Sequence, residues 1–284
     1  TVSVKKNLIK FFYIDDKYQG EGLAIELINS ALEDIIAKGY RSYFVFTKAK
    51  NENIFTSLSM DTIEKTEDVV LLEGGFFKYN DWIETIKKDL DKDEYNAIVM
   101  NANPLTLGHE YLVDKALEDH RDLIIFVLEE EASYFSTKDR YEIVKKHYQD
   151  NDRVHVYKSG PYIISRATFP TYFLKKDTDK IKVYTELDAK IFARRIAKDL
   201  NIKKRYFGTE PIDKVTQKYN EMMKKILYEY GIATEFIERK TIDGEVISAS
   251  KVREYYENDF SACKKYLSSD VYELLEIKRS GNND

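Results

Sequence analysis

The chain has 284 residues, of which 45 are Lys or Arg and 50 are Asp or Glu, so its formal net charge is −5. This balance argues against a strongly basic nucleic-acid binder, and 43% hydrophobic residues with 22 Tyr and 15 Phe argue against intrinsic disorder. A single cysteine excludes an internal disulfide, and no apolar run reaches the ~20 residues that a membrane-spanning helix needs. We therefore expect a soluble, cytoplasmic protein of two domains, with neither nucleic acid nor membrane as a partner.

The first 75 residues alternate between strand-like and helix-like patterns. The apolar run from Leu8 to Ile14 predicts a strand, and residues 23–37 carry apolar side chains at the spacing of one helix face. Short apolar runs at 43–46 and 69–72 predict two further strands. We expect these segments to form one α+β domain over residues 1–75, followed by a polar linker helix over residues 76–94.

A second block, residues 95–284, repeats the order strand then helix. The predicted strands lie at 97–100, 123–128, 154–157, 205–207 and 234–237. The predicted helices include 138–148, 189–200, 216–230 and one that contains Leu112 to Leu117. Strands separated by helices of this length indicate parallel βαβ units. The fold class predicted for this block is therefore α/β, with a parallel sheet.

The most informative segment is Asn-Ala-Asn-Pro-Leu-Thr-Leu-Gly-His at 101–109, between a predicted strand and a predicted helix. Ligands of open parallel sheets bind beyond the carboxyl ends of the strands, and a helix start offers unpaired N–H groups to a phosphate. Gly108 lets the backbone come close to a ligand, while Thr106 and His109 offer a hydroxyl and a ring N–H. The alternative interpretation makes Thr106 a helix cap and His109 a surface residue.

A second segment, Ile-Ser-Ala-Ser-Lys-Val-Arg at 247–253, also begins a predicted helix. Ser248 and Ser250 can cap that helix. They can equally bind a phosphate there, with Arg253 supplying the counter-charge one turn later. Ser-x-Ser before a helix is common by itself, but two phosphate-suited helix starts in one βαβ block are much more specific.

Together the two segments resemble the HxGH nucleotidyltransferase superfamily, with Thr106 where many members have the first His, as in the phosphopantetheine adenylyltransferase branch. The resemblance implies a Rossmann-like catalytic domain over 95–284, with helices on both faces of its sheet. Five blocks are similar to the citrate lyase ligase family in particular. They are Met100 to Leu112, Gly160 to Leu174, Thr185 to Ala189, Gly208 to Pro211 and Ile247 to Arg253.

The segment from Gln19 to Ala24 resembles the acyl-CoA pyrophosphate loop of GNAT acetyltransferases, and citrate lyase ligases are similar in carrying a GNAT-like domain before the transferase domain. The expected loop residues are Gln19, Gly20, Gly22 and Ala24. A GNAT domain has further strands and helices before this loop. We therefore expect residues 1–75 to be a partial GNAT-like domain that starts inside the fold. A vestigial or partner-docking role is the alternative to acyl-CoA binding.

The family resemblance implies an acid–thiol ligase that joins acetate to the thiol of a phosphopantetheine-like prosthetic group on the citrate lyase acyl-carrier subunit. It further implies ATP as substrate with Mg²⁺ on its phosphates, AMP and pyrophosphate as products, and acetyl-adenylate as intermediate. The implied catalytic residues are Thr106, His109, Ser250 and Arg253. The implied ATP contacts are these four with Asn101, Asn103, Gly108, Gly208, Thr209, Glu210 and Ser248.

Arg166 is the candidate contact for acetate or an incoming phosphate, because a guanidinium binds a planar carboxylate at two points. A structural salt bridge is its alternative role. Lys138 and Arg140 open a predicted helix, where solvated charges are commoner than triphosphate contacts. Cys263 is expected to be a packing residue, and we expect no residue to serve as a protein metal ligand.

Three other functions remain open. A pantetheine-phosphate adenylyltransferase would need no acetate and would release a dinucleotide. A GNAT acetyltransferase with a nucleotide-sensing domain would bind acetyl-CoA and form no pyrophosphate. A non-catalytic assembly factor docked on a lyase complex would bind ATP without turnover.

Overall fold

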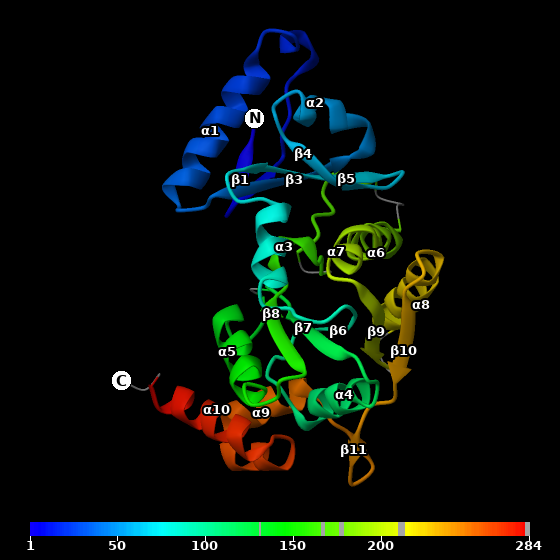
Figure 1. Cartoon of the computed structure of the whole chain (residues 1–284). Helices are drawn as coiled ribbons and strands as arrows, with labels where there is room; N and C mark the ends of the chain where they lie inside the picture. Colours follow the sequence, from blue (N-terminus) through cyan, green and yellow to red (C-terminus); the bar gives the residue numbers. More distant parts are fainter. Residues whose placement is uncertain (131, 166–167, 176–178, 210–213, 282–284) are drawn as a thin grey trace.

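The computed structural model describes residues 1–130, 132–165, 168–175, 179–209 and 214–281, and these ranges form two five-stranded sheets joined through a helix (Figure 1). The first sheet has the order β1-β2-β3-β5-β4 and is mixed, because only β2 and β3 are parallel neighbours. Its strands are β1 (Ser3–Lys5), β2 (Leu8–Lys10), β3 (Ser42–Lys48), β4 (Asp61–Lys65) and β5 (Val69–Gly75).

Both faces of the first sheet are buried, and side chains alternate between them as the strand period requires. Val45, Val70 and Leu72 face α1 (Leu23–Ala37) and α2 (Glu52–Thr56), where Ile28, Ile35 and Phe55 complete one core. The side chains between them, including Phe44, Phe46 and Leu71, enter a larger core that also contains residues of the second sheet.

The second sheet is entirely parallel, with the order β10-β9-β6-β7-β8. Its strands are β6 (Tyr95–Met100), β7 (Asp122–Val127), β8 (Val154–Lys158), β9 (Ile202–Gly208) and β10 (Ala233–Ile237). The helices are α3 (Tyr79–Lys87), α4 (Leu107–Leu117), α5 (Thr137–His147), α6 (Lys180–Ile191), α7 (Ala197–Asp199), α8 (Lys214–Glu229), α9 (Ala249–Asn258) and α10 (Ser269–Gly281). A π-helical turn, Phe192–Ile196, joins α6 to α7, and a small hairpin of β11 (Thr241–Ile242) and β12 (Glu245–Val246) precedes α9.

Helices cover both faces of the second sheet, as the family resemblance implies. Ala97, Ile124 and Phe126 pack in the core that holds α3, α6, α7 and α8. Ile98 and Ile125 pack on the opposite face with α4, α5, α9 and α10. The apolar runs of β6 and β7 are continuous because neither face of the sheet meets water.

The two sheets share one core and several direct polar contacts. The rings of Phe44 and Tyr162 meet edge to face, with centroids 5.8 Å apart. Tyr162 donates its hydroxyl to Glu73 at 2.7 Å, and the backbone N–H of Tyr79 donates to the same carboxyl. Burial raises the pKa of Glu73 above its usual range. Two donors to one buried carboxyl tie β5, α3 and the segment after β8 into a fixed arrangement.

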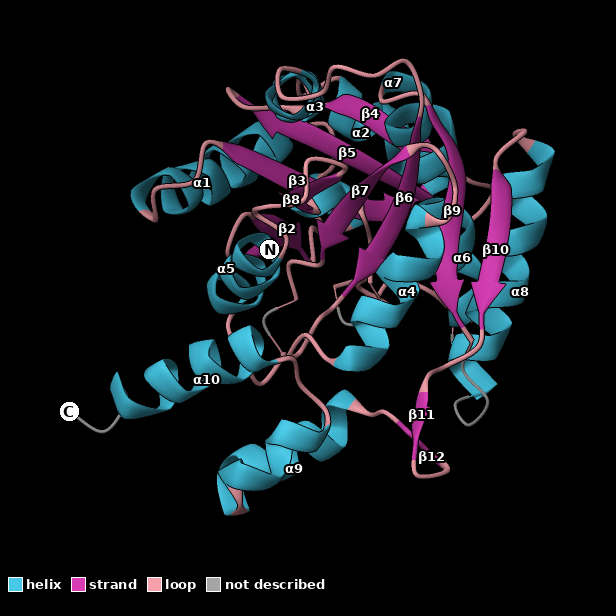
Figure 2. Ribbon diagram, turned by 60° about the horizontal axis from the view of Figure 1, so that its bottom comes forward, coloured by secondary structure: helices cyan, strands magenta, loops and turns pink. Residues whose placement is uncertain are grey.

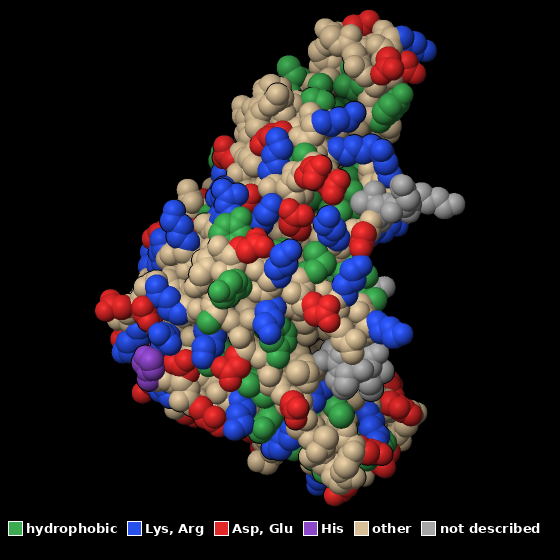
Figure 3. Space-filling model, turned by 90° about the vertical axis from the view of Figure 1, so that its right-hand side faces the viewer, with side chains coloured by type: hydrophobic (Ala, Val, Ile, Leu, Met, Phe, Trp, Pro, Cys, Tyr) green, Lys and Arg blue, Asp and Glu red, His purple; other side chains and the backbone are tan. Residues whose placement is uncertain are grey.

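Most predicted elements are confirmed, including the helix at 23–37 and the parallel strands of the second block. The strand predicted from Leu8 to Ile14 is wrong beyond Lys10, because Phe11 takes a positive φ of 51° and the chain leaves the sheet. The helix predicted from 189 is the second part of a longer one that begins at Lys180. None of the helices in the described ranges is long and apolar enough to cross a membrane. Figure 3 shows a face on which basic and acidic side chains are interspersed.

Candidate active site

The two segments singled out in the sequence lie against each other at the carboxyl edge of the second sheet. Figure 2 shows β6, β9 and β10 pointing toward the side that holds α9 and the β11–β12 hairpin. A Cβ atom added to Gly108 would lie 3.4 Å from the Cβ atom of Ile247, the residue that precedes the α9 cap. The start of α4 therefore lies in close contact with the segment that leads into α9.

His109 is held in one orientation by the first turn of α4. The backbone N–H of Thr106, the N-cap residue, donates to His109 Nδ1 at 3.1 Å, and Thr106 Oγ1 lies 2.9 Å from the same nitrogen. Burial lowers the pKa of His109 to about 4, and the charge of Arg239 adds to that effect. The ring is therefore neutral at pH 7. Since Nδ1 accepts a hydrogen bond, the proton resides on Nε2, which is left as a donor.

Thr106 itself is buried, and its hydroxyl lies against the histidine ring. This geometry fits the helix-cap interpretation of Thr106, and of the two side chains only that of His109 is partly exposed.

Arg253 joins the two segments directly. Its guanidinium donates to the backbone oxygen of Asn103 at 2.6 Å and to Ser250 Oγ at 2.8 Å. Burial lowers the pKa of Arg253, but a guanidinium remains a cation at neutral pH. Ser248 is the N-cap residue of α9. The structure thus brings Asn103, Ser250 and Arg253 together beside the start of α4.

Asn101 and Asn103 are occupied by contacts within the protein. Asn103 Oδ1 accepts the backbone N–H of Phe135 at 3.0 Å. The side chain of Asn101 contacts Ser133 Oγ and accepts from Arg140 at 2.8 Å. Both asparagines therefore fix the loop after β6 to the segment before α5.

Arg140 is fully buried, so the prediction that its charge is solvated on the helix surface is wrong. Its guanidinium donates to the backbone oxygens of Asn101, Leu128, Glu130 and Phe135 and to Thr137 Oγ1, at 2.7–3.0 Å. Every nitrogen is used, which offsets the cost of burying the charge. The spacing of apolar residues could have predicted this burial, because Arg140 lies on the same face of α5 as the buried side chains of Ile143 and Val144.

Gly208 and Thr209 lie where β9 ends, beside β10. The backbone N–H of Thr209 donates to the backbone oxygen of Ile237 at 2.9 Å, and Arg239 Nε donates to the backbone oxygen of Thr209 at 2.8 Å. Arg239 was missed in the sequence, although it follows a strand of the parallel sheet by two residues and so belongs to the same edge. Glu210 and Arg166 lie outside the described residues.

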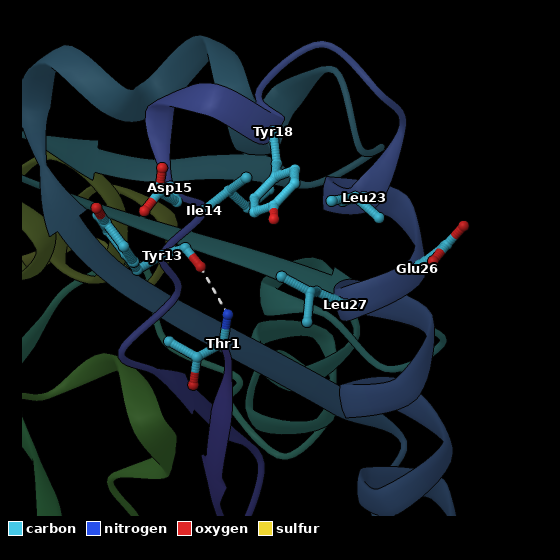
Figure 4. A pocket seen from close by; sticks show the side chains of 8 residues that line it. All are labelled: Thr1, Tyr13, Ile14, Asp15, Tyr18, Leu23, Glu26 and Leu27. Atoms are coloured by element: carbon cyan, nitrogen blue, oxygen red, sulfur yellow. Dashed lines mark hydrogen bonds between the residues drawn. The ribbon is translucent and has the colours of Figure 1, made fainter.

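The predicted acyl-CoA-like loop lies in the other half of the molecule. Gly20 and Gly22 both have positive φ, and Gly22 caps α1 without a side-chain hydrogen bond. Gln19 Nε2 is bound to Asp16 Oδ1 at 2.7 Å, and Ala24 lies in the first turn of α1. A nearby cavity of about 530 Å³ is lined by eight other residues (Figure 4). They are Thr1, Tyr13, Ile14, Asp15, Tyr18, Leu23, Glu26 and Leu27.

Cys263 is fully buried, as expected of a packing residue, and burial raises the pKa of its thiol to about 11. In the ranges that the structure describes, no group of three His, Cys, Asp or Glu side chains is placed to hold a metal ion.

The fold and the site define an α/β protein whose hydrogen-bond donors and cations meet at two helix starts, an arrangement suited to a phosphorylated ligand. The family described as "Citrate lyase ligase C-terminal domain" matches residues 95–275. The chain belongs to the citrate lyase ligase family, and it is an enzyme of the ligase class.

Two relatives illustrate the similarity. The [Citrate [pro-3S]-lyase] ligase of Klebsiella pneumoniae is 35% identical over 260 residues, which cover 89% of this chain and 76% of the relative. The protein of the same name from Escherichia coli (strain K12) is 35% identical over 278 residues, covering 95% of this chain and 79% of the relative. Among solved structures, Thermotoga maritima TmcAL bound with alpha-thio ATP is 14% identical with a TM-score of 0.42, over 67% of this chain and 56% of that one.

Proposed function

We propose that this chain uses ATP to join acetate to the prosthetic-group thiol of the citrate lyase acyl-carrier subunit, releasing AMP and pyrophosphate. The names of the curated relatives, ligases of citrate (pro-3S)-lyase, support the choice of acceptor. The observation that supports the proposal is the hydrogen bond from Arg253 to the backbone oxygen of Asn103, which holds the start of α9 against the loop that leads to His109. The need for ATP places the proposed reaction in the cytoplasm.

The proposed reaction has two steps. A carboxylate oxygen of acetate attacks the α-phosphorus of ATP, and the bond from that phosphorus to the bridging oxygen of pyrophosphate breaks. The resulting acetyl-adenylate is then attacked at its carbonyl carbon by the sulfur of the thiol. AMP leaves with the carboxyl oxygen, and the thiol proton passes to solvent. No enzyme nucleophile is needed, so the protein's task is to position the reactants and stabilise charge.

His109 and the arginines supply that stabilisation in our proposal. The neutral ring of His109 donates through Nε2 to an α-phosphate oxygen, while Arg253 and Ser250 hold the departing phosphates. Arg239, whose charge lies close enough to affect His109, is a second cation for the polyphosphate. Thr106 positions the histidine, and Asn101 and Asn103 position the loop, through the contacts described above.

The nucleoside and the metal complete the substrate. The end of β9 at Gly208 and Thr209, together with Glu210, is proposed to hold the ribose and adenine. The cap residue Ser248 is proposed to bind the departing phosphates beside Ser250 and Arg253. Arg166 is the proposed acetate contact. ATP enters as its Mg²⁺ complex, and Mg²⁺ binds mainly through substrate phosphates and water.

The test is pyrophosphate release from ATP, measured with and without acetate and with deacetylated citrate lyase. We expect release only when acetate is present, and a stoichiometric acetyl thioester on the carrier when the lyase is added. Release that is independent of acetate, or a dinucleotide product, would contradict the proposal.

A further inference from the structure

A second cavity, of about 720 Å³, lies between the two sheets. Its apolar wall is built from both halves of the molecule, with Phe44 and Phe46 from β3, Trp82 from α3 and Ile163 from the segment after β8. The volume is in the range of sites that take an extended small molecule. Because the residues come from both sheets, the cavity is a product of their fixed packing.

Four lysines and two glutamates line the same cavity. Lys5, Lys6 and Lys10 come from β1, β2 and the turn between them, and Lys158 ends β8. Glu129 and Glu130 follow β7. Positive charges outnumber negative ones by two. Burial lowers the pKa of Lys10, and the nearby charge of Lys5 lowers it further. An anion bound here would relieve that repulsion.

Arg140 lies between the cavity and the loop after β6. Its guanidinium donates to Glu130 O at 2.9 Å and to Thr137 Oγ1 at 3.0 Å, and both residues line the cavity. The same group donates to Asn101 at the end of β6. Arg140 therefore contacts both the lining of the cavity and the loop that leads from β6 to α4.

The walls of the cavity are held firmly. Gly160, which lines it, has φ of 59°, and a Cβ atom there would lie 2.9 Å from Trp82 Nε1, so the indole rests on the backbone. The neighbouring Ile164 N–H donates to the buried carboxylate of Asp188 at 2.7 Å. Since the Glu73–Tyr162 contact fixes the same segment to the first sheet, the cavity is present before a ligand arrives.

We propose that this cavity receives the phosphorylated, flexible thiol arm of the acceptor, with the lysines on its phosphate and the aromatic wall on its chain. This inference rests on the proposed function, which requires an acceptor thiol to reach an acyl-adenylate at the neighbouring site. A phosphate at one end and a largely uncharged chain match the two kinds of lining, cationic and apolar.

The test compares pantetheine 4′-phosphate with pantetheine as acetyl acceptors, and each with deacetylated citrate lyase. In the unaltered enzyme we expect kcat/KM for the phosphorylated acceptor to exceed that for pantetheine by at least ~10-fold, the effect of one charge-assisted phosphate contact. Lys10→Glu should remove most of this preference, and Lys158→Glu is the second variant. Lys225→Glu, an equal charge change at an exposed residue of α8, should retain the preference.

Acetate-dependent exchange of pyrophosphate into ATP, measured without any acceptor, separates the two proposals. If the unaltered enzyme shows no acetate-dependent exchange of pyrophosphate into ATP, the proposed function itself is contradicted. With exchange intact, equal use of the two acceptors by the unaltered enzyme, or a full phosphate preference in both lysine variants, overturns the assignment of the cavity. If the enzyme acetylates free coenzyme A in preference to the carrier-bound arm, the proposal that the cavity receives the arm of the carrier is overturned.

Discussion

Helices α1 and α4 both begin after a strand and a loop, but their first turns differ in the groups they present. Gly22 begins α1 with no side-chain hydrogen bond, and the loop before it closes on itself through Gln19 and Asp16. At α4, Thr106 and His109 cap each other and Arg253 arrives from another helix start. The two helix starts thus share a strand and a glycine but differ in the side chains that surround them, and at α4 one of these side chains comes from a distant segment.

The largest expected effect comes from removing the donor at α4. His109→Ala should lower acetate-dependent pyrophosphate release by at least ~10²-fold, the scale for losing one preorganised charge-stabilising donor. His120→Ala is the matched control, because that side chain is 83% exposed. A His109→Ala enzyme with near-normal turnover and a normal circular dichroism spectrum would contradict the proposal that the start of α4, unlike that of α1, supplies a catalytic donor.

Arg253→Lys should lower kcat/KM for ATP by ~10-fold. Lysine keeps the charge but cannot reach both Asn103 O and Ser250 Oγ, which the planar guanidinium contacts together. Steady-state kinetics with varied ATP measure the effect. An unchanged kcat/KM would mean that the site needs only a positive charge from α9.

Gly22→Ala should affect stability rather than catalysis. Its φ of 82° is costly for a residue with a Cβ atom, so the free energy of unfolding should fall by ~1 kcal/mol. Urea denaturation measures this, and pyrophosphate release should stay within about twofold of normal. Acetyl transfer from acetyl-CoA to an amine, abolished by this substitution, would instead make the loop before α1 a working acyl-CoA site.

The smallest effect concerns pH. Burial lowers the pKa of His109 to about 4, so the ring gains its second proton only as the pH falls toward 4, not near 6.5. The ratio of normal to His109→Asn rates should therefore change less than about twofold between pH 5.5 and 8. A ratio that falls tenfold around pH 6.5 would show that the histidine acts from a solvated position.

The sequence was informative where a pattern is local. Apolar spacing predicted α1 from Leu23 to Ala37, and buried runs predicted the parallel strands. The short strands β1 and β4 escaped notice because three to five residues carry little periodicity. Arg140, Arg239 and the cavity between the sheets depend on contacts between distant segments, which no local pattern records. The two phosphate-suited motifs were recognised separately, and only the fold places Gly108 against Ile247.

The core shared by the two sheets has a practical consequence for anyone who wishes to shorten this chain. A fragment that begins at residue 95 would keep every strand of the parallel sheet but lose Trp82 and Tyr79, leaving Tyr162 and Phe126 without their cover. Exposed aromatic surface of this kind favours aggregation. We expect such a fragment to accumulate in inclusion bodies, so a minimal expression product should retain α3 and β5 with the parallel sheet.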